Sequence, residues 1–170
     1  MARRRTATRC LALGAAAACL PAAAHGSAAQ PAAAVTCPMS HVHYKPYPGI
    51  EQGLRPIPWV ATAPGGRFKA SLFFYEAVPW AKQHLLGARI FTTRKPRDYN
   101  PKVLWITRTH GYTKTLKMTG RRLDAPGSFS ATYNGYGDYP SYVEVPAPGC
   151  WRVTVSTGSV SGSVVFSASD

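Results

Sequence analysis

Residues 149–166 decide the fold, and they read GCWRVTVSTGSVSGSVVF. Side chains of an extended chain alternate between two faces, so Trp151, Val153 and Val155 share one face of a first strand. The Thr-Gly-Ser sequence at 157–159 favours a reversal of the chain. A second strand then returns with its apolar positions on one side, at Val160, Gly162, Val164 and Phe166. The chain is therefore predicted to end in a β-hairpin that buries a tryptophan.

Further strand-like runs precede this hairpin at roughly ten-residue spacing, separated by Gly, Pro, Asn and Asp. They are predicted at 67–76, 87–93, 102–108, 115–119, 128–133 and 141–145. About seven or eight short strands at this spacing are typical of a single all-β antiparallel sandwich. Residues 102–108 are apolar on both faces, which indicates a central strand that places Trp105, like Trp151, between the sheets. A helix is expected only at 80–86, for a turn or two.

The first 34 residues have the composition of a signal peptide followed by a low-complexity Ala/Pro spacer. Four arginines precede a short apolar core, and this core is shorter than the roughly 20 residues that span a bilayer. Recurrent prolines at 35–58 predict an extended arm over the surface, and residues 59–170 are the predicted β-sandwich domain. We expect a secreted protein or one held in the cell envelope. Cys19, after a run of alanines, leaves a lipid anchor as an alternative.

Two cysteines, Cys37 and Cys150, remain beyond this leader. An even number of cysteines in an exported chain predicts a disulfide. The bond would fasten the first ordered segment to the final hairpin. In the chain-entropy model, closing so long a loop stabilises the domain by roughly 4–5 kcal/mol.

The chain is strongly basic, with a formal net charge of +13. Without the four arginines of the leader, 16 Lys and Arg stand against 7 Asp and Glu, a net charge of +9. This surplus favours an acidic partner, such as an envelope polymer or an extracellular protein. The tightest basic cluster, at 94–97, is short, so specific nucleic-acid binding is not expected.

Four pieces of the second half stand out: Trp105, TGRRLD at 119–124, YPS at 139–141 and PGCWRVT at 148–154. Over about residues 100–166 they resemble a C-terminal signature of uncharacterised bacterial exported proteins. The resemblance implies an immunoglobulin-like β-sandwich and an exported location. It implies no activity.

A tyrosine-rich stretch at 133–142, YNGYGDYPSY, is the candidate ligand surface. Its glycines predict a loop at one end of the sandwich, where such folds carry recognition. Tyrosine combines contact area with a hydroxyl group, which suits a sugar ring or a protein partner. The candidate contact residues are Tyr133, Asn134, Tyr136, Asp138, Tyr139 and Tyr142. The alternative is that these tyrosines cap the core while the glycines serve turn geometry.

A second hypothesis is a metal site, most suitably for copper, on the Pro-rich arm. In an extended segment Met39, His41 and His43 project to the same side, and thioether and imidazole groups are ligands that suit copper. A disulfide would remove Cys37 from this ligand set. The alternative is a pair of histidines that simply face solvent.

A third hypothesis is a cysteine-dependent enzyme. Gly149-Cys150-Trp151-Arg152, with His110 upstream, superficially resembles parts of cell-wall L,D-transpeptidases, in which a cysteine thiolate attacks an amide. The residues before Gly149 depart from that pattern, and a disulfide with Cys37 would remove the thiol of Cys150. We therefore expect a non-catalytic binding protein without a cofactor.

Overall fold

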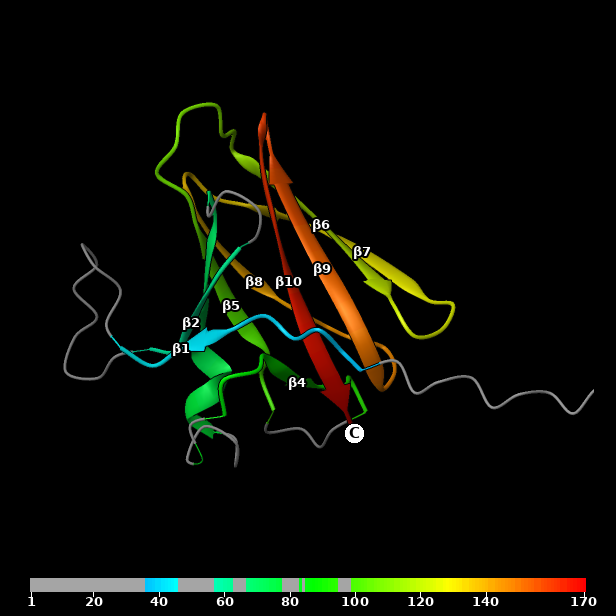
Figure 1. Cartoon of the computed structure of the whole chain (residues 1–170). Helices are drawn as coiled ribbons and strands as arrows, with labels where there is room; N and C mark the ends of the chain where they lie inside the picture. Colours follow the sequence, from blue (N-terminus) through cyan, green and yellow to red (C-terminus); the bar gives the residue numbers. More distant parts are fainter. Residues whose placement is uncertain (1–35, 46–56, 63–66, 78–82, 84, 95–98) are drawn as a thin grey trace, which may run out of the picture. The chain divides into compact units, whose positions relative to one another are not determined.

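Two five-stranded sheets make up the part of the chain that the structure, a computed structural model, describes (Figure 1). That part comprises residues 36–45, 57–62, 67–77, 83, 85–94 and 99–170. The predicted all-β sandwich is confirmed, with ten strands among these residues rather than seven or eight. The immunoglobulin-like topology stays a prediction. The predicted signal peptide and spacer at 1–34 and most of the predicted helix at 80–86 lie outside the described residues.

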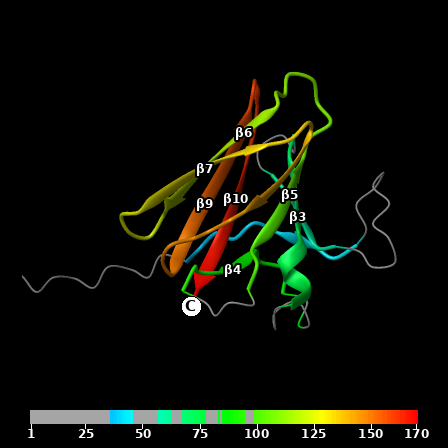
Figure 2. The ribbon, with the colours of Figure 1, turned by 180° about the vertical axis from the view of Figure 1, so that it is seen from behind.

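The first sheet has the strand order β1-β2-β3-β5-β8, and the second has the order β4-β10-β9-β6-β7 (Figures 1 and 2). The strands of the first sheet are β1 (Val42–His43), β2 (Trp59–Ala61), β3 (Lys69–Leu72), β5 (Lys102–Ile106) and β8 (Asp138–Tyr142). Those of the second are β4 (Arg89–Phe91), β6 (Thr115–Arg122), β7 (Ser128–Asn134), β9 (Gly149–Thr157) and β10 (Val160–Ser169). Neighbouring strands run antiparallel, except that β4 lies parallel to the last residues of β10.

The C-terminal hairpin of β9 and β10 is confirmed. Thr157 pairs with Val160, which leaves a two-residue turn at Gly158 and Ser159. Gly158 has φ +54°, a left-handed conformation that glycine adopts at little cost. The apolar residues of both strands enter the core at the alternate positions that the sequence predicts.

The predicted strand at 67–76 is wrong in its second half. β3 ends at Leu72, and Phe73–Ala77 form a 3₁₀ helix. A strand would send the neighbouring Phe74 and Tyr75 to opposite faces. The helical turn lets both rings enter the core, where their centroids lie 5.1 Å apart.

Other predicted boundaries also move, and β4 and β5 are shorter than the runs predicted at 87–93 and 102–108. β6 continues beyond the predicted 115–119 to Arg122, and the strand predicted at 141–145 is β8, which starts at Asp138. β8 contains Pro140, which suggested a turn in the sequence. Because β8 is an edge strand of the first sheet, a residue without a backbone N–H fits there.

The predicted Pro-rich arm at 35–58 belongs in part to the sandwich. Val42 in β1 is completely buried and pairs with Val60 in β2, so this part of the arm does not run over the surface. Ser40 is also fixed, because its N–H donates to the carbonyl of Val165 and its Oγ accepts from the N–H of Val165, both at 2.9 Å. Residues 46–56 of the arm lie outside the described residues.

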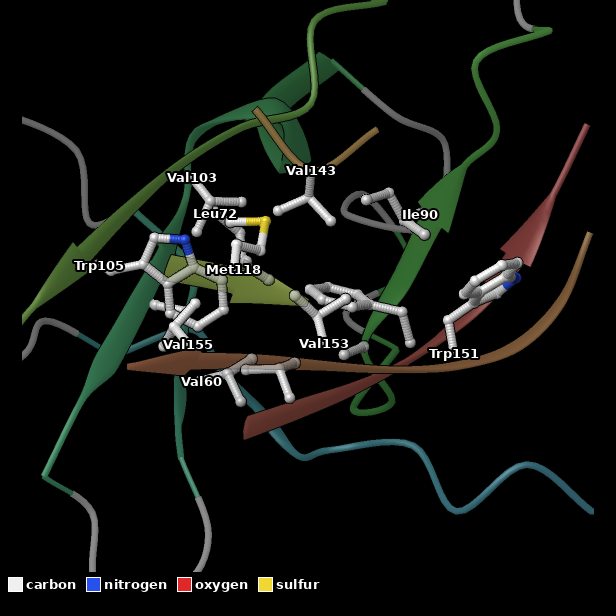
Figure 3. Close-up of a cluster of buried hydrophobic side chains, with 14 of the residues drawn as sticks. Val60, Leu72, Ile90, Val103, Trp105, Met118, Val143, Trp151, Val153 and Val155 are labelled. Carbon is white, nitrogen blue, oxygen red and sulfur yellow. The ribbon is translucent and has the colours of Figure 1, made fainter. Parts of the chain in front are cut away.

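The core lies between the sheets and is filled from both sides (Figure 3). The first sheet contributes Val60, Leu72, Val103 and Trp105, and the second contributes Met118, Val153 and Val155, all completely buried. Both predicted core tryptophans are buried, Trp105 completely and Trp151 with 1% exposure.

The indole of Trp105 has a hydrogen-bond partner inside this core. Its Nε1–H donates to Ser141 Oγ at 2.9 Å, and that hydroxyl donates to the carbonyl of Val103 at 3.2 Å. A buried indole N–H that loses its acceptor keeps the full cost of its desolvation.

We therefore predict that Ser141→Ala lowers the free energy of unfolding by about 1–3 kcal/mol, since it leaves the buried indole N–H of Trp105 without its acceptor. Urea denaturation followed by tryptophan fluorescence measures the change. Ser130→Ala, on an exposed position of β7, is the matched control and is expected to unfold like the wild type. Equal stabilities of the two variants would contradict the prediction.

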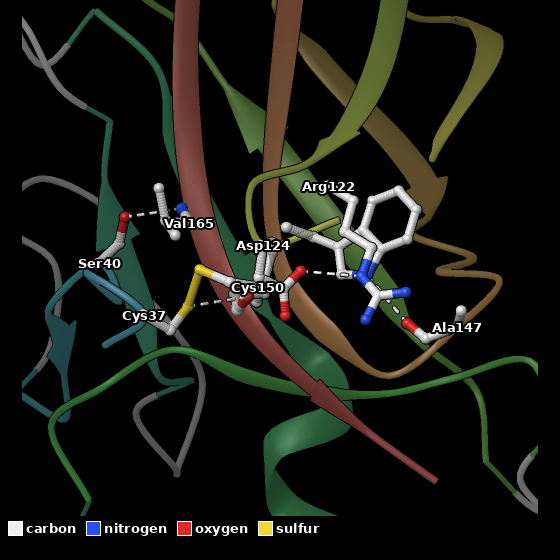
Figure 4. Close-up of a disulfide and its surroundings, with 9 residues drawn as sticks. Cys37, Ser40, Arg122, Asp124, Ala147, Cys150 and Val165 are labelled. Carbon is white, nitrogen blue, oxygen red and sulfur yellow. Dashed lines mark hydrogen bonds and ion pairs between the residues drawn. A yellow bond between two sulfur atoms is a disulfide. The ribbon is translucent and has the colours of Figure 1, made fainter. Parts of the chain in front are cut away.

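The predicted disulfide between Cys37 and Cys150 is present (Figure 4). The α-carbons lie 5.4 Å apart and the sulfur atoms 2.07 Å apart, across a sequence separation of 113 residues. The bond ties the segment before β1 to the start of β9. Together with the hydrogen bonds of Ser40, it fixes residues 37–40 along β10.

Replacing both cysteines with serine is expected to lower the free energy of unfolding by about 5 kcal/mol, because the unfolded chain regains the entropy of the open loop. Guanidinium denaturation of the oxidised wild type and the Cys37→Ser/Cys150→Ser variant measures this difference. The reduced wild type should have the same free energy of unfolding as the double variant. A difference below about 1 kcal/mol between the oxidised and the reduced protein would refute the stabilising role of the disulfide.

Candidate binding faces

The tyrosine-rich stretch is not the loop that the sequence predicts. Tyr133 and Asn134 end β7 in the second sheet, and Asp138 begins β8 in the first. Residues 135–137 are all that connects them, so the chain crosses here from one sheet to the other. Tyr142, at the far end of β8, lies four residues along an extended strand from Asp138, or about 13 Å away.

Tyr139 is a core residue, so its prediction as a ligand contact is wrong. The side chain is completely buried, and its hydroxyl donates to the carbonyl of Thr113 and lies 3.2 Å from Thr157 Oγ1. The cause is strand alternation, because Tyr139 and Ser141 are the inward positions of β8.

The other five candidate residues divide into separate environments. Tyr133 is half-buried, burial raises the pKa of its phenol, and its hydroxyl donates to the carbonyl of Tyr142 at 2.7 Å. Asp138 forms an ion pair with Arg108 at 2.8 Å.

Tyr136, Tyr142 and Asn134 remain accessible. Tyr136 is 70% exposed and meets Tyr112 edge-on, with ring centroids 5.3 Å apart. Tyr142 is 45% exposed, at the other end of β8. The six residues therefore do not form one contact surface.

We predict opposite effects for two tyrosines that look alike in the sequence. Tyr139→Ala should lower the free energy of unfolding by about 3–5 kcal/mol, because it opens a core cavity. Tyr136→Ala should change the stability by less than about 0.5 kcal/mol, because its ring is mostly in solvent. Thermal unfolding of both variants, followed by circular dichroism, tests the contrast, which fails if Tyr136→Ala is the more destabilised.

The two histidines of the predicted metal site lie next to each other. His41 forms a bridge with Gly87, and His43 lies in β1 opposite Trp59. Their ring centroids are 4.6 Å apart, and the ring of His43 stacks on Trp59 at 4.2 Å. Burial, and then the neighbouring His41, lower the pKa of His43. Within the described ranges, no three His, Cys, Asp or Glu side chains are grouped closely enough to hold a metal ion.

Cys150 does not meet His110. The cysteine is the second residue of β9, whereas Gly111, the neighbour of His110, accepts a hydrogen bond from Ser159 in the turn after the opposite end of β9. Seven residues of extended strand separate Cys150 from Thr157, a distance of about 23 Å. With its sulfur in the disulfide as well, Cys150 has neither a free thiol nor this histidine as a base.

The outer side of the second sheet carries a face that sequence reasoning missed. Three cross-strand rows run over β7, β6, β9 and β10: Thr132-Lys117-Ser156-Ser161, Ser130-Thr119-Thr154-Ser163 and Ser128-Arg121-Arg152-Val165. Of these twelve residues, eight are Ser or Thr, three are cations and none is a carboxylate. All are exposed or half-buried. We name these twelve residues the hydroxyl-cation face.

Two like charges are paired within this face. Arg121 on β6 lies directly opposite Arg152 on β9, and both are exposed. Like charges at opposed positions of neighbouring strands are destabilising. The ion pairs of the described residues join Arg108 to Asp138 and Arg122 to Asp124, so neither member of this arginine pair is neutralised there.

A shallow depression lies at the ends of β4 and β8. It is lined by Phe91, Tyr99, Pro101, Val143 and Glu144, with two threonines, and has a volume of about 120 Å³. Pockets for small molecules usually begin at roughly 300 Å³. This depression is therefore too small to serve as a substrate pocket.

Comparison of the chain with protein-family models, curated proteins and solved structures finds no match. The resemblance to exported bacterial proteins therefore stays an expectation. In the part of the chain that the structure describes, no helix has the length and apolar character to cross a membrane.

Proposed function

We propose that this chain is a non-catalytic binding domain of the cell envelope or the extracellular space, and that its partner is an acidic polysaccharide bound on the hydroxyl-cation face. The observation that carries the proposal is the composition of that face: eight hydroxyl side chains and three cations without a carboxylate.

Charge selects the class of partner. The arginine pair on neighbouring strands repels itself until an anion lies between or above the two guanidinium groups. Arginine binds carboxylate and phosphate groups with two parallel hydrogen bonds, so each guanidinium offers an oriented contact. The net charge without the predicted leader, 16 Lys and Arg minus 7 Asp and Glu or +9, acts in the same direction by drawing acidic partners toward the protein.

The geometry favours a polymer over a small anion. Lys117 and Arg121 are four residues apart on β6, a distance of about 13 Å along the strand. One small anion cannot contact both, whereas an extended chain of acidic sugars can. The Ser and Thr side chains between them offer donors and acceptors to sugar hydroxyls.

An extracellular or envelope location is supported by the disulfide, because such bonds persist in oxidising compartments. The disulfide also supports a non-catalytic role, since it occupies the sulfur that a cysteine-dependent enzyme would use.

We expect the oxidised protein to bind polygalacturonate, and Arg121→Gln/Arg152→Gln to weaken this binding at least tenfold. The dependence of the binding constant on salt should also become shallower, because fewer charges are neutralised in the complex. Titration calorimetry at several salt concentrations measures both quantities. Neutral dextran should bind neither protein.

The matched control is Arg67→Gln/Arg94→Gln, which removes the same charge from exposed positions outside the face. It should keep most of the affinity. Equal losses in the two double variants would show that net charge alone drives binding, and this would contradict the proposed face. Tighter binding to double-stranded DNA than to polygalacturonate would contradict the polysaccharide as partner.

The same face predicts a stability difference in the free protein. Arg152→Gln removes the like-charge pair, so it should unfold at an equal or higher temperature than the wild type at low salt. Differential scanning calorimetry measures the midpoint. A clearly lower midpoint would show that Arg152 stabilises the fold instead of serving a partner.

A further inference from the structure

Three soft or borderline ligand groups come together at the edge of the first sheet, outside the hydroxyl-cation face. They are the thioether of Met39 and the imidazoles of His41 and His43. Val42, between the two histidines, is completely buried in the core. By strand alternation, His41 and His43 therefore face away from the core.

The two imidazoles are separated by a distance that a single metal ion permits. A metal–nitrogen bond of about 2.0 Å places a ring centroid roughly 3.2 Å from the ion. At the tetrahedral ligand angle of about 109°, the two centroids would then lie roughly 5.2 Å apart, so the rings need to separate by only about 0.6 Å to bind one ion. The observed separation is 4.6 Å, with the rings inclined at 71°.

The thioether of Met39 lies on the same side as these rings. His41 is paired with Gly87 in an antiparallel bridge, so side chains at these two positions would point the same way. A Cβ atom on Gly87 would lie 2.9 Å from Met39 Sδ and 2.7 Å from its Cε. The missing side chain of Gly87 thus leaves the space that the thioether fills beside His41.

Neighbouring residues that the structure describes fix the orientation of the histidine rings but do not form hydrogen bonds with their ring nitrogens. His43 is held by stacking on Trp59, whose indole N–H in turn donates to the carbonyl of Lys45 at 3.0 Å. Among the described residues, the hydrogen bonds of the protein leave the ring nitrogens of His41 and His43 without a partner. These nitrogens are therefore available as ligands.

We propose that Met39, His41 and His43 form a binding site for Cu(I). A thioether and two neutral imidazoles are a soft to borderline ligand set without a carboxylate, which suits Cu(I) better than Ca²⁺ or Mg²⁺. The site shares no residue with the hydroxyl-cation face, and its two histidines lie at β1 in the first sheet, so the two proposals are tested by different variants.

The test is competition for Cu(I) between the oxidised full-length protein and a chromogenic Cu(I) chelator, with ascorbate present and the free thiols alkylated beforehand. We expect one Cu(I) per chain. His41→Ala/His43→Ala should weaken binding at least 100-fold, and Met39→Leu about tenfold. His110→Ala, which changes an exposed histidine elsewhere, is the control and should bind like the wild type.

Two further measurements test whether Met39 is a copper ligand or has only a structural role. X-ray absorption of the copper-loaded protein should show one sulfur neighbour at about 2.3 Å that disappears in Met39→Leu. Gly87→Ala should also weaken binding, because its methyl group displaces the thioether and leaves both imidazoles intact. Cooperative thermal unfolding of each variant shows that it is folded.

An affinity of His41→Ala/His43→Ala within threefold of the wild type would overturn the proposal. So would an equal loss in His110→Ala, or a sulfur neighbour that persists in Met39→Leu.

Discussion

The disulfide between Cys37 and Cys150 is the constraint on which the architecture depends. The segment at 36–45 contributes a strand of only two residues, and so short an element cannot hold its own place in a sheet. The covalent bond to β9 and the two hydrogen bonds between Ser40 and the backbone of Val165 hold this segment in place. With that anchorage, Val42 enters the core and the two histidines stay on its outer side. Both the completion of the first sheet and the geometry of the proposed copper site thus follow from one cross-link between the ends of the domain.

Much of the fold could be predicted from local pattern. Regular alternation predicted the terminal hairpin and its buried face, and the count of cysteines beyond the predicted leader predicted the disulfide. The prediction failed where tertiary burial overrides alternation. Phe74 and Tyr75 both find space in the core, so the chain coils there instead of continuing as a strand. It failed again at the start of β8, because Gly135 and Gly137 just before the strand and Pro140 within it indicate a loop. The proline fits because β8 is an edge strand, which the sequence alone does not show.

The candidate sites show the same limit. The tyrosines at 133–142 share one stretch of sequence, yet alternation along β8 sends Tyr139 into the core. Tyr136 lies in the connection before β8 and stays in solvent. The hydroxyl-cation face, by contrast, could be predicted in part from the sequence. Polar residues alternate at Lys117, Thr119 and Arg121, and again at Arg152, Thr154 and Ser156. Sequence alone could not show that these two runs lie side by side, because that requires the pairing of β6 with β9. The register of β6 against β9 involves residues far apart in the sequence, and it is this register that places Lys117, Arg121 and Arg152 on one face.

The position of β10 has a consequence for how the chain acquires its structure during synthesis. This last strand is not at an edge: β9 flanks it along one side, and β4 and Ser40 bind it along the other. A nascent chain grows from its amino terminus, so β4 and β9 lack the strand that lies between them until β10 has been synthesised. Until then β4 and β9 each have an unpaired edge, and unpaired strand edges promote aggregation. Removing β10 would therefore leave β4 and β9 each with an unpaired edge.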